Sequence, residues 1–235
     1  MQGHETLGRL LTRRREKLLV DSMATVCHSF PRAFTEEGMK SVTTAMALTM
    51  LTFAGAAHAT DCIDAKSARA GFVLEKPGIR SEFQPAPGGM IAIANKYQSD
   101  SPQLQYLYAG LIEVFRDSDT GRLSMIPLGD IKKLFPLKAG AKSKIEFVRL
   151  STKTPPKGTE TLALSVKGKE SYSLGDCKYN VLAVDETITG DTGNVIDAFT
   201  ALYSPDLQAV LARRYDSGTS AQSEVGFETI KPLVQ

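Results

Sequence analysis

The chain has 235 residues, a formal net charge of +2 and no tryptophan. Its three histidines, seven of its 28 basic residues and five of its 26 acidic residues all precede Thr60. Residues 60–235 therefore have no net charge and no histidine. This excludes a strongly basic nucleic-acid-binding surface and every catalytic triad that needs histidine, so we predict no nucleic-acid partner.

Residues 39–59 have the three parts of a secretory signal peptide. Lys40 supplies the positive start, residues 42–54 form an apolar stretch without a charge, and Ala57 and Ala59 are small residues at positions −3 and −1. The stretch is short and rich in threonine for a transmembrane span. We predict cleavage near Ala59 and a periplasmic or secreted protein with no transmembrane span. A buried core helix within the same stretch is the alternative.

Residues 1–38 precede this signal, although export signals begin near the N-terminus. The favoured interpretation is that translation starts at Met39 and that these residues are an over-extended reading of the gene. The alternative is a genuine extension, whose leucines recur at helical spacing around a basic run and would form an amphipathic helix on a membrane surface. Residues 60–235 are predicted to form a single exported β-rich domain.

Cys62 and Cys177 are the two cysteines that remain after cleavage. An exported protein meets oxidising conditions, so we predict a disulfide between them. The bond would pin the N-terminal segment to a strand that starts at Cys177, directly after a Gly-Asp turn. Two unpaired thiols are the alternative.

Most of the chain after Thr60 has the period-two pattern that is typical of strands. Residues 104–116 are apolar on both faces, so we predict one long strand that is covered on both sides. Residues 130–135 are predicted as one helical turn, with Asp130 near its start. The other strands expected in the first two thirds are 71–76, 90–97, 122–128, 145–150, 161–166 and 170–174.

Alternation is clearest in the last third. Strands are predicted at 177–188, 195–203, 207–215 and 224–231, with turns rich in Gly, Pro and Asp between them. Strands that follow one another at this short spacing indicate an antiparallel meander. We predict an all-β or β-dominated fold, as a curved sheet, sandwich or barrel, with at most short helices.

Two segments of this last third carry a resemblance. The strand Gly-Asp-Cys-Lys-Tyr-Asn-Val at 175–181, and the hairpin at 202–215 with Tyr203, Pro205 and Leu207, are similar to a pattern in uncharacterised exported bacterial β-sheet proteins. These modules resemble, more distantly, the half-barrel carriers of lipoprotein localisation, which hold acyl chains in a concave sheet. The resemblance implies a neighbouring fold and no active site.

Two short motifs match those of catalytic or metal-binding sites, but the residues around them do not. Asp-Thr-Gly occurs at 119–121 and 191–193, but aspartic proteases bury this tripeptide, and both copies here have the sequence of exposed turns. A calcium loop that starts at Asp117 would need a glutamate where Leu128 stands. We predict no metal and no cofactor.

We predict that the protein is not an enzyme, although two kinds of catalytic residue pair remain open. A Ser–Lys dyad or a pair of carboxylates could still act, and Ser165, Lys167 and Glu186 offer the residue types. No spacing singles them out.

Two groups of residues are candidates for binding. Tyrosine combines an apolar ring with a polar tip, which suits a ligand-lined concavity, although ordinary core packing explains the same residues. Lysines in a local cluster could contact an anionic lipid head group or envelope polymer, although solvated loops explain them equally. The tyrosines are Tyr106, Tyr108, Tyr179, Tyr203 and Tyr215, and the lysines are Lys132, Lys133, Lys142 and Lys144.

Three functions follow as hypotheses. The first is an exported, non-enzymatic envelope protein that binds an apolar or amphipathic ligand, such as a lipid, or another envelope component. The second is a structural or adhesive surface module without a pocket. The third is a hydrolase that uses carboxylates. A cavity would favour the first, a filled sandwich the second, and two buried carboxylates in one cleft the third.

Overall fold

A computed structural model describes residues 62–98, 101–156 and 158–234. The predicted signal peptide, its cleavage site and the extension at 1–38 lie outside these residues. The described chain forms thirteen strands in one antiparallel sheet, and its helices are single 3-10 turns. The bounds are η1 (Ser67–Ala70), β1 (Phe72–Lys76), β2 (Ile79–Ala86), η2 (Pro87–Gly89), β3 (Met90–Tyr97), β4 (Gln103–Tyr108), β5 (Ile112–Ser118), β6 (Gly121–Pro127), η3 (Ile131–Leu134), β7 (Lys142–Ser151), β8 (Thr159–Leu174), β9 (Cys177–Thr189), β10 (Val195–Ser204), β11 (Ala209–Tyr215), β12 (Ser223–Gly226) and β13 (Thr229–Pro232).

The strands follow the chain in a meander, since each strand from β1 to β11 pairs with the next one in sequence. Short turns make this possible, because glycine supplies the positive φ that a tight reversal needs. Gly121 (φ 116°) and Gly193 (φ 80°) do so in the two Asp-Thr-Gly turns, which are exposed as predicted. The all-β antiparallel meander predicted from the sequence is confirmed.

The C-terminal segment bridges the two edges of this sheet. β12 pairs with β11 at one edge, and β13 pairs with β1 at the other. Between them the Phe227 N–H donates to the Leu211 carbonyl (3.0 Å) and the Glu228 N–H donates to the Glu75 carbonyl (2.8 Å). β12 and β13 do not pair with each other, so the ladder is not closed. The predicted strand 224–231 is therefore two short strands that serve different edges.

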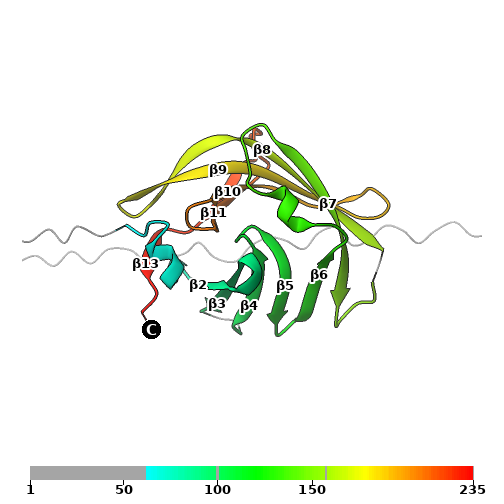
Figure 1. The fold of residues 1–235 in the computed structure, drawn as a ribbon, viewed down its shortest axis with the longest axis horizontal. Coiled ribbons are helices and arrows are strands. Elements are labelled where there is room, and N and C mark those ends of the chain that lie inside the picture. Colours follow the sequence, from blue (N-terminus) through cyan, green and yellow to red (C-terminus); the bar gives the residue numbers. More distant parts are fainter. Residues whose placement is uncertain (1–61, 99–100, 157, 235) are drawn as a thin grey trace, which may run out of the picture. The chain divides into compact units, whose positions relative to one another are not determined.

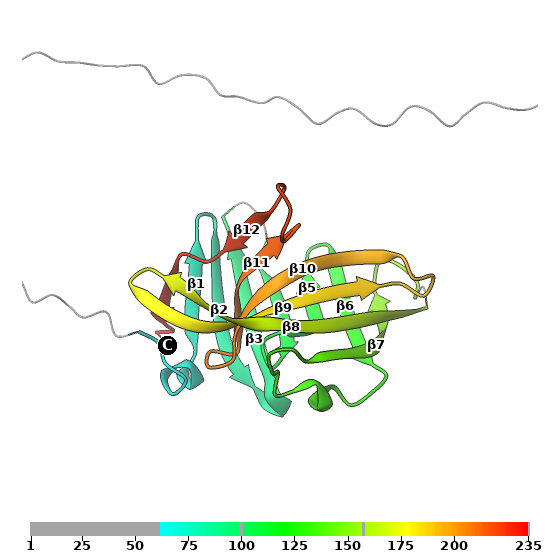
Figure 2. The ribbon, with the colours of Figure 1, turned by 90° about the horizontal axis from the view of Figure 1, so that it is seen from above.

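The curved sheet forms two walls. Strands β2–β6 lie side by side in one wall, and the long strands β8–β10 run across them in the other (Figures 1 and 2). Buried side chains fill two regions between the walls. One, which includes Phe72, Leu74 and Val181, surrounds the disulfide, and the other includes Phe147 and Val184.

The single strand predicted at 104–116 is wrong. It is the hairpin of β4 and β5, which reverses at Ala109 (φ 50°) and Gly110 (φ 70°). A Cβ on Gly110 would overlap the Gln208 carbonyl oxygen, so this turn fits directly against the β10–β11 connection. Gly110 is the one turn residue in this stretch, and the apolar residues on either side of it have the pattern of a single strand. Cover on both faces is not complete, since Leu104 is 37% exposed.

Two smaller differences concern β2 and β8. No strand was predicted at residues 79–86, where β2 lies. The two strands predicted at 161–166 and 170–174 are one strand, β8, with an irregularity between Val166 and Gly168. The helical turn is confirmed as η3, where the Asp130 carboxylate accepts from the Lys132 N–H (3.1 Å).

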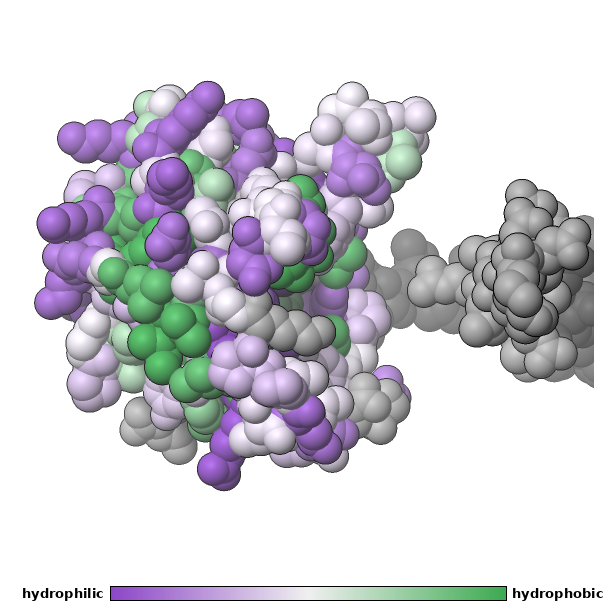
Figure 3. All heavy atoms as spheres, turned by 90° about the vertical axis from the view of Figure 1, so that its right-hand side faces the viewer, coloured by the Kyte–Doolittle hydropathy of each residue, from purple (hydrophilic) through white to green (hydrophobic). Residues whose placement is uncertain are grey.

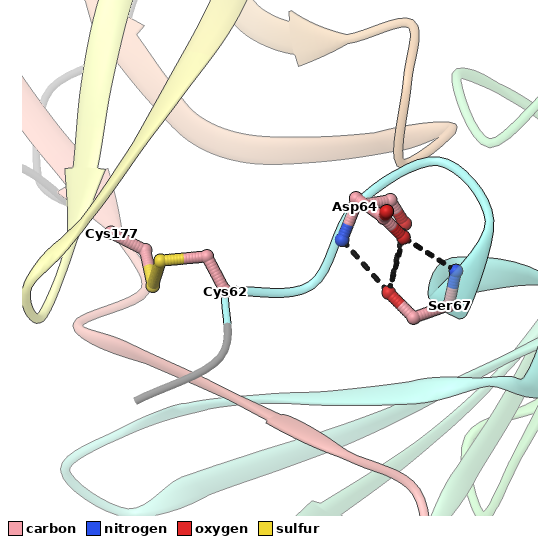
Figure 4. Close-up of a disulfide and its surroundings, with 4 residues drawn as sticks. All are labelled: Cys62, Asp64, Ser67 and Cys177. Carbon is pink, nitrogen blue, oxygen red and sulfur yellow. Dashed lines mark hydrogen bonds between the residues drawn. A yellow bond between two sulfur atoms is a disulfide. The ribbon is translucent and has the colours of Figure 1, made fainter. Parts of the chain in front are cut away.

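Cys62 and Cys177 form the predicted disulfide, with their Cα atoms 5.6 Å apart (Figure 4). Close by, the Asp64 carboxylate accepts hydrogen bonds from the Ser67 hydroxyl (2.6 Å) and the Ser67 N–H (2.7 Å). These bonds from Ser67 lower the pKa of Asp64. The start of the described chain is thus covalently tied to β9 and continues into a hydrogen-bonded turn.

Candidate functional site

The space between the walls contains a first cleft of about 270 Å³. β2, β3 and β4 supply one side of it, and β11, β12 and Phe227 supply the other. Its apolar lining includes Phe83, Ile93, Leu107 and Leu211. A concave, mainly apolar space with a few polar groups is the usual form of a small-molecule site.

A row of polar side chains crosses the apolar wall of the first cleft. The register places Ser81 opposite Asn95, and Asn95 opposite Gln103. The Ser81 hydroxyl donates to Asn95 Oδ1 (2.6 Å), while Asn95 Nδ2 donates to the side-chain oxygens of Gln103 (3.2 Å) and Gln105 (3.1 Å). Ser81 and Asn95 are buried, and because they are hydrogen-bonded the cost of burying them is largely offset. The row gives the first cleft fixed polar groups.

A second cleft, also of about 270 Å³, lies between β5–β8 and β9–β11. Two arginines in it are each held by a glutamate through two hydrogen bonds. Arg116 donates to Glu113 (2.6 and 2.5 Å), and Arg149 donates to Glu160 (2.6 and 2.8 Å). Such bidentate pairs neutralise both partners and fix their geometry.

Glu186 is a buried carboxyl in the second cleft. It lies on β9 directly opposite Phe199 of β10 and is 6% exposed. Burial raises its pKa to about 8, while Arg213 opposes the rise and Asp197 adds to it. Glu186 is therefore largely protonated at neutral pH, and a protonated carboxyl can donate a hydrogen bond as well as accept one.

Arg213 of β11 lines both clefts. Its guanidinium carbon lies 4.4 Å from the centre of the Phe199 ring, a cation–π contact. Within the described residues it forms no salt bridge. Glu186, Phe199 and Arg213 thus form a row across three neighbouring strands, at the junction of the two clefts.

One of the five predicted tyrosines lies in these clefts. Tyr215 lines the first cleft, and its ring packs 6.0 Å from that of Phe199. Tyr106 does not line either cleft. It stands opposite Phe115 and next to Leu107, which points into the first cleft, so it lies on the outer face of β4.

The other three tyrosines contribute to packing around the clefts. Tyr108 packs against Phe135, with ring centres 5.5 Å apart. The buried Tyr203 hydroxyl donates to the Ala109 carbonyl (2.7 Å), and burial raises the pKa of Tyr203. Tyr179 is buried in the region around the disulfide.

The four predicted lysines lie on one side of the molecule but outside the clefts. Lys132 and Lys133 belong to η3, and Lys142 and Lys144 belong to β7. All four are exposed, and none has a salt bridge among the residues that the structure describes. Exposed apolar side chains such as Ile126 and Leu150 lie farther along β6 and β7. Figure 3, which views the right-hand side of Figure 1, shows hydrophobic residues gathered there with hydrophilic ones around them.

Glu186 is named from the sequence only as a residue type for a carboxylate pair and Arg213 is not named, although strand alternation places both in their strands. Glu186 continues the inward series Leu182 and Val184 on β9, and Arg213 follows Ala209 and Leu211 on β11 at the same spacing. Glu186 is buried, and a charged residue that is buried in a strand is expensive and typical of a functional site, whereas Arg213 is exposed at the rim of the clefts. The sequence did not show that the two residues meet.

No protein-family model matches the sequence, and no curated protein is significantly similar to it. The solved structure of the hypothetical lipoprotein YmcC from Escherichia coli (K12) is similar at 13% sequence identity, with a TM-score of 0.44. The match covers 74% of this chain and 92% of that chain. The chain thus has a weak, distant similarity to a lipoprotein-type protein. Among the described residues no helix is long and apolar enough to cross a membrane.

Proposed function

We propose that this protein is an exported envelope protein that binds an amphipathic ligand between its two walls and does not act as an enzyme. The observation that supports this most directly is the first cleft. Its apolar floor suits an acyl chain or similar tail, and its row of hydrogen-bonded amides suits a polar group. A surface module that only packs against or adheres to other molecules does not need such a cleft.

Export is supported by the disulfide. Structural disulfides form and persist in oxidising compartments and are rare in the cytosol. The bond between Cys62 and Cys177 lies just after the predicted cleavage point, so the mature chain would begin close to it.

The test is native mass spectrometry of the protein isolated from its own envelope without detergent. We expect an added mass that organic solvent extracts and that identifies the ligand. Val225, which is 48% exposed, lines the first cleft, so Val225→Trp should reduce the fraction of protein that carries this mass. Val195→Trp is the matched control, because Val195 is 61% exposed and lines neither cleft.

The chain has no tryptophan, so each variant also carries a single fluorescent reporter. Emission at position 225 should shift to shorter wavelength when an amphiphile binds, whereas emission at 195 should not. Ligand-free protein from the envelope, together with unchanged emission at 225 in the presence of added amphiphiles, would contradict the proposal.

A carboxylate hydrolase is the second candidate, because one observation favours it. Burial keeps Glu186 largely protonated at neutral pH, as a general acid must be, and Asp197 provides a second carboxyl on the same face of the neighbouring strand. The two other carboxylates of the second cleft are held by arginines. A panel of chromogenic esters and glycosides separates the candidates, since turnover that Glu186→Gln abolishes would support the hydrolase.

A further inference from the structure

Resting on the ligand-binding function proposed above, we infer that the ligand is an anionic amphiphile, and that its carboxylate or phosphate group is bound by Arg213 at the junction of the two clefts. The first cleft would hold the apolar part of the same molecule.

The charges along the first cleft favour an anion. Lys76 and Arg213 both line it, and no aspartate or glutamate does. Neither cation forms a salt bridge within the described part of the chain. A cleft with two unneutralised cations and no carboxylate attracts a negatively charged group and disfavours a cationic one.

Arg213 is positioned to use its hydrogen-bond donors on a ligand. Its guanidinium carbon lies 4.4 Å from the centre of the Phe199 ring, which restrains the side chain, and the residue is exposed and forms no salt bridge within the described residues, so its N–H groups are accessible to a ligand. Guanidinium N–H groups match the two oxygens of a carboxylate or phosphate. By contrast, Arg116 and Arg149 already use theirs on glutamates.

Glu186 explains why Arg213 is not neutralised from within the protein. Among the described residues it is the one buried acid and it interacts electrostatically with Arg213, but its burial keeps it largely protonated at neutral pH. Above pH 8 it ionises and competes with the ligand for Arg213. The other charged groups that line this cleft are Asp197 of β10 and the two pairs Arg116–Glu113 and Arg149–Glu160.

The experiment uses three probes with the same tail, dodecanoate, dodecyl phosphate and dodecanol, below the concentrations at which they aggregate. Isothermal titration calorimetry at pH 6.5 measures their affinities for the full exported protein. We expect both anions to bind at least tenfold more tightly than the alcohol. The ratio between the two anions identifies whether a carboxylate or a phosphate is preferred.

Four variants test which side chain binds the charged group. Arg213→Gln should weaken both anions about tenfold and leave the alcohol unchanged, whereas Arg213→Lys should retain most of the affinity. Lys144→Gln removes an exposed cation outside the cleft and should change nothing. Glu186→Gln should bind dodecanoate equally at pH 6.5 and pH 9, while the wild type loses affinity between these values.

The outcomes separate this inference from the function on which it rests. Equal binding of alcohol and anions, unaffected by Arg213→Gln, would overturn the anionic head group and leave the ligand-binding function standing. If none of the three probes binds, and the envelope protein carries no ligand, both fail. Equal loss of affinity in Lys144→Gln would show non-specific attraction and would also overturn the assignment to Arg213.

Discussion

At the scale of single residues, Glu186 is the feature that ordinary folding does not explain. A buried carboxyl without an ionic partner destabilises a fold, and replacing it with an apolar residue is often neutral or stabilising. The protein nevertheless has Glu186 in a cleft, opposite Phe199 and near Arg213. Such a residue is typical of a functional site, whereas the exposed ion pairs of the outer faces contribute little.

Glu186→Gln should stabilise the protein at alkaline pH. Because the folded pKa is raised from 4.5 to about 8, the folded state holds a proton that the unfolded state has already lost, and stability falls as the pH rises through this interval. The full fall for a shift of this size is roughly 5 kcal/mol. Urea denaturation at pH 5, 7 and 9 should show this fall in the wild type and its absence in Glu186→Gln.

Glu146→Gln is the control for that series, because Glu146 is exposed on β7. Glu75 and Glu82 have a pKa lowered chiefly by hydrogen bonds from Lys231 and Lys96, so they titrate below the range of the experiment. A wild-type free energy of unfolding that stays level from pH 5 to 9 would rule out the buried, protonated carboxyl.

At the scale of elements, the fold depends on how turns of one wall meet strands of the other. The β4–β5 turn lies against the β10–β11 connection, and there the Tyr203 hydroxyl also bonds to the Ala109 carbonyl. This contact joins the walls at one end of the clefts. It therefore sets their separation, which decides whether an open space remains between them.

Gly110→Ala should be strongly destabilising, by about 2–4 kcal/mol, because the new methyl group meets the Gln208 backbone and the residue has positive φ. Gly88→Ala is the matched control. Gly88 has a similar φ of 77°, but a methyl group there would meet nothing within 4 Å, so only the conformational cost of about 1 kcal/mol is expected. If both variants lost the same stability in thermal or urea denaturation, the β4–β5 turn would not be in close contact with the Gln208 backbone.

At the scale of the whole molecule, two devices hold the sheet in its curved form. The C-terminal segment ties its two edges together through β12 and β13. The disulfide ties the start of the chain to β9 across a sequence separation of 115 residues. Both act between parts that are far apart in the sequence, so neither depends on local hairpin formation.

Cys62→Ser and Cys177→Ser should each lower the free energy of unfolding by a similar amount, roughly 2–5 kcal/mol, because both remove the same constraint on the unfolded chain. The double variant should be no less stable than either single one. Denaturation of the wild type with and without dithiothreitol gives an independent value of the same quantity. Losses that add up in the double variant would mean that each cysteine acts through its own packing.

The sequence by itself determined the hairpins and the cross-link. Period-two alternation and glycine-containing turns are local signals, so β3, β9 and β10 could be placed within a few residues, and two cysteines in an exported chain leave a single pairing. The tyrosines could not be sorted in the same way, because Tyr106 and Tyr215 look alike in the sequence but lie on different faces of their strands.

Only the tertiary structure decided what the clefts contain. Glu186 and Arg213 lie on either side of Phe199 because β9 pairs with β10 and β10 pairs with β11, while Glu113 and Glu160 neutralise Arg116 and Arg149. The reversal at Gly110 likewise depends on the Gln208 backbone of a distant segment. Glu186 and Arg213, like Gly110 and Gln208, are remote along the chain, and the energies of their interactions depend on burial and distance, which no local pattern encodes.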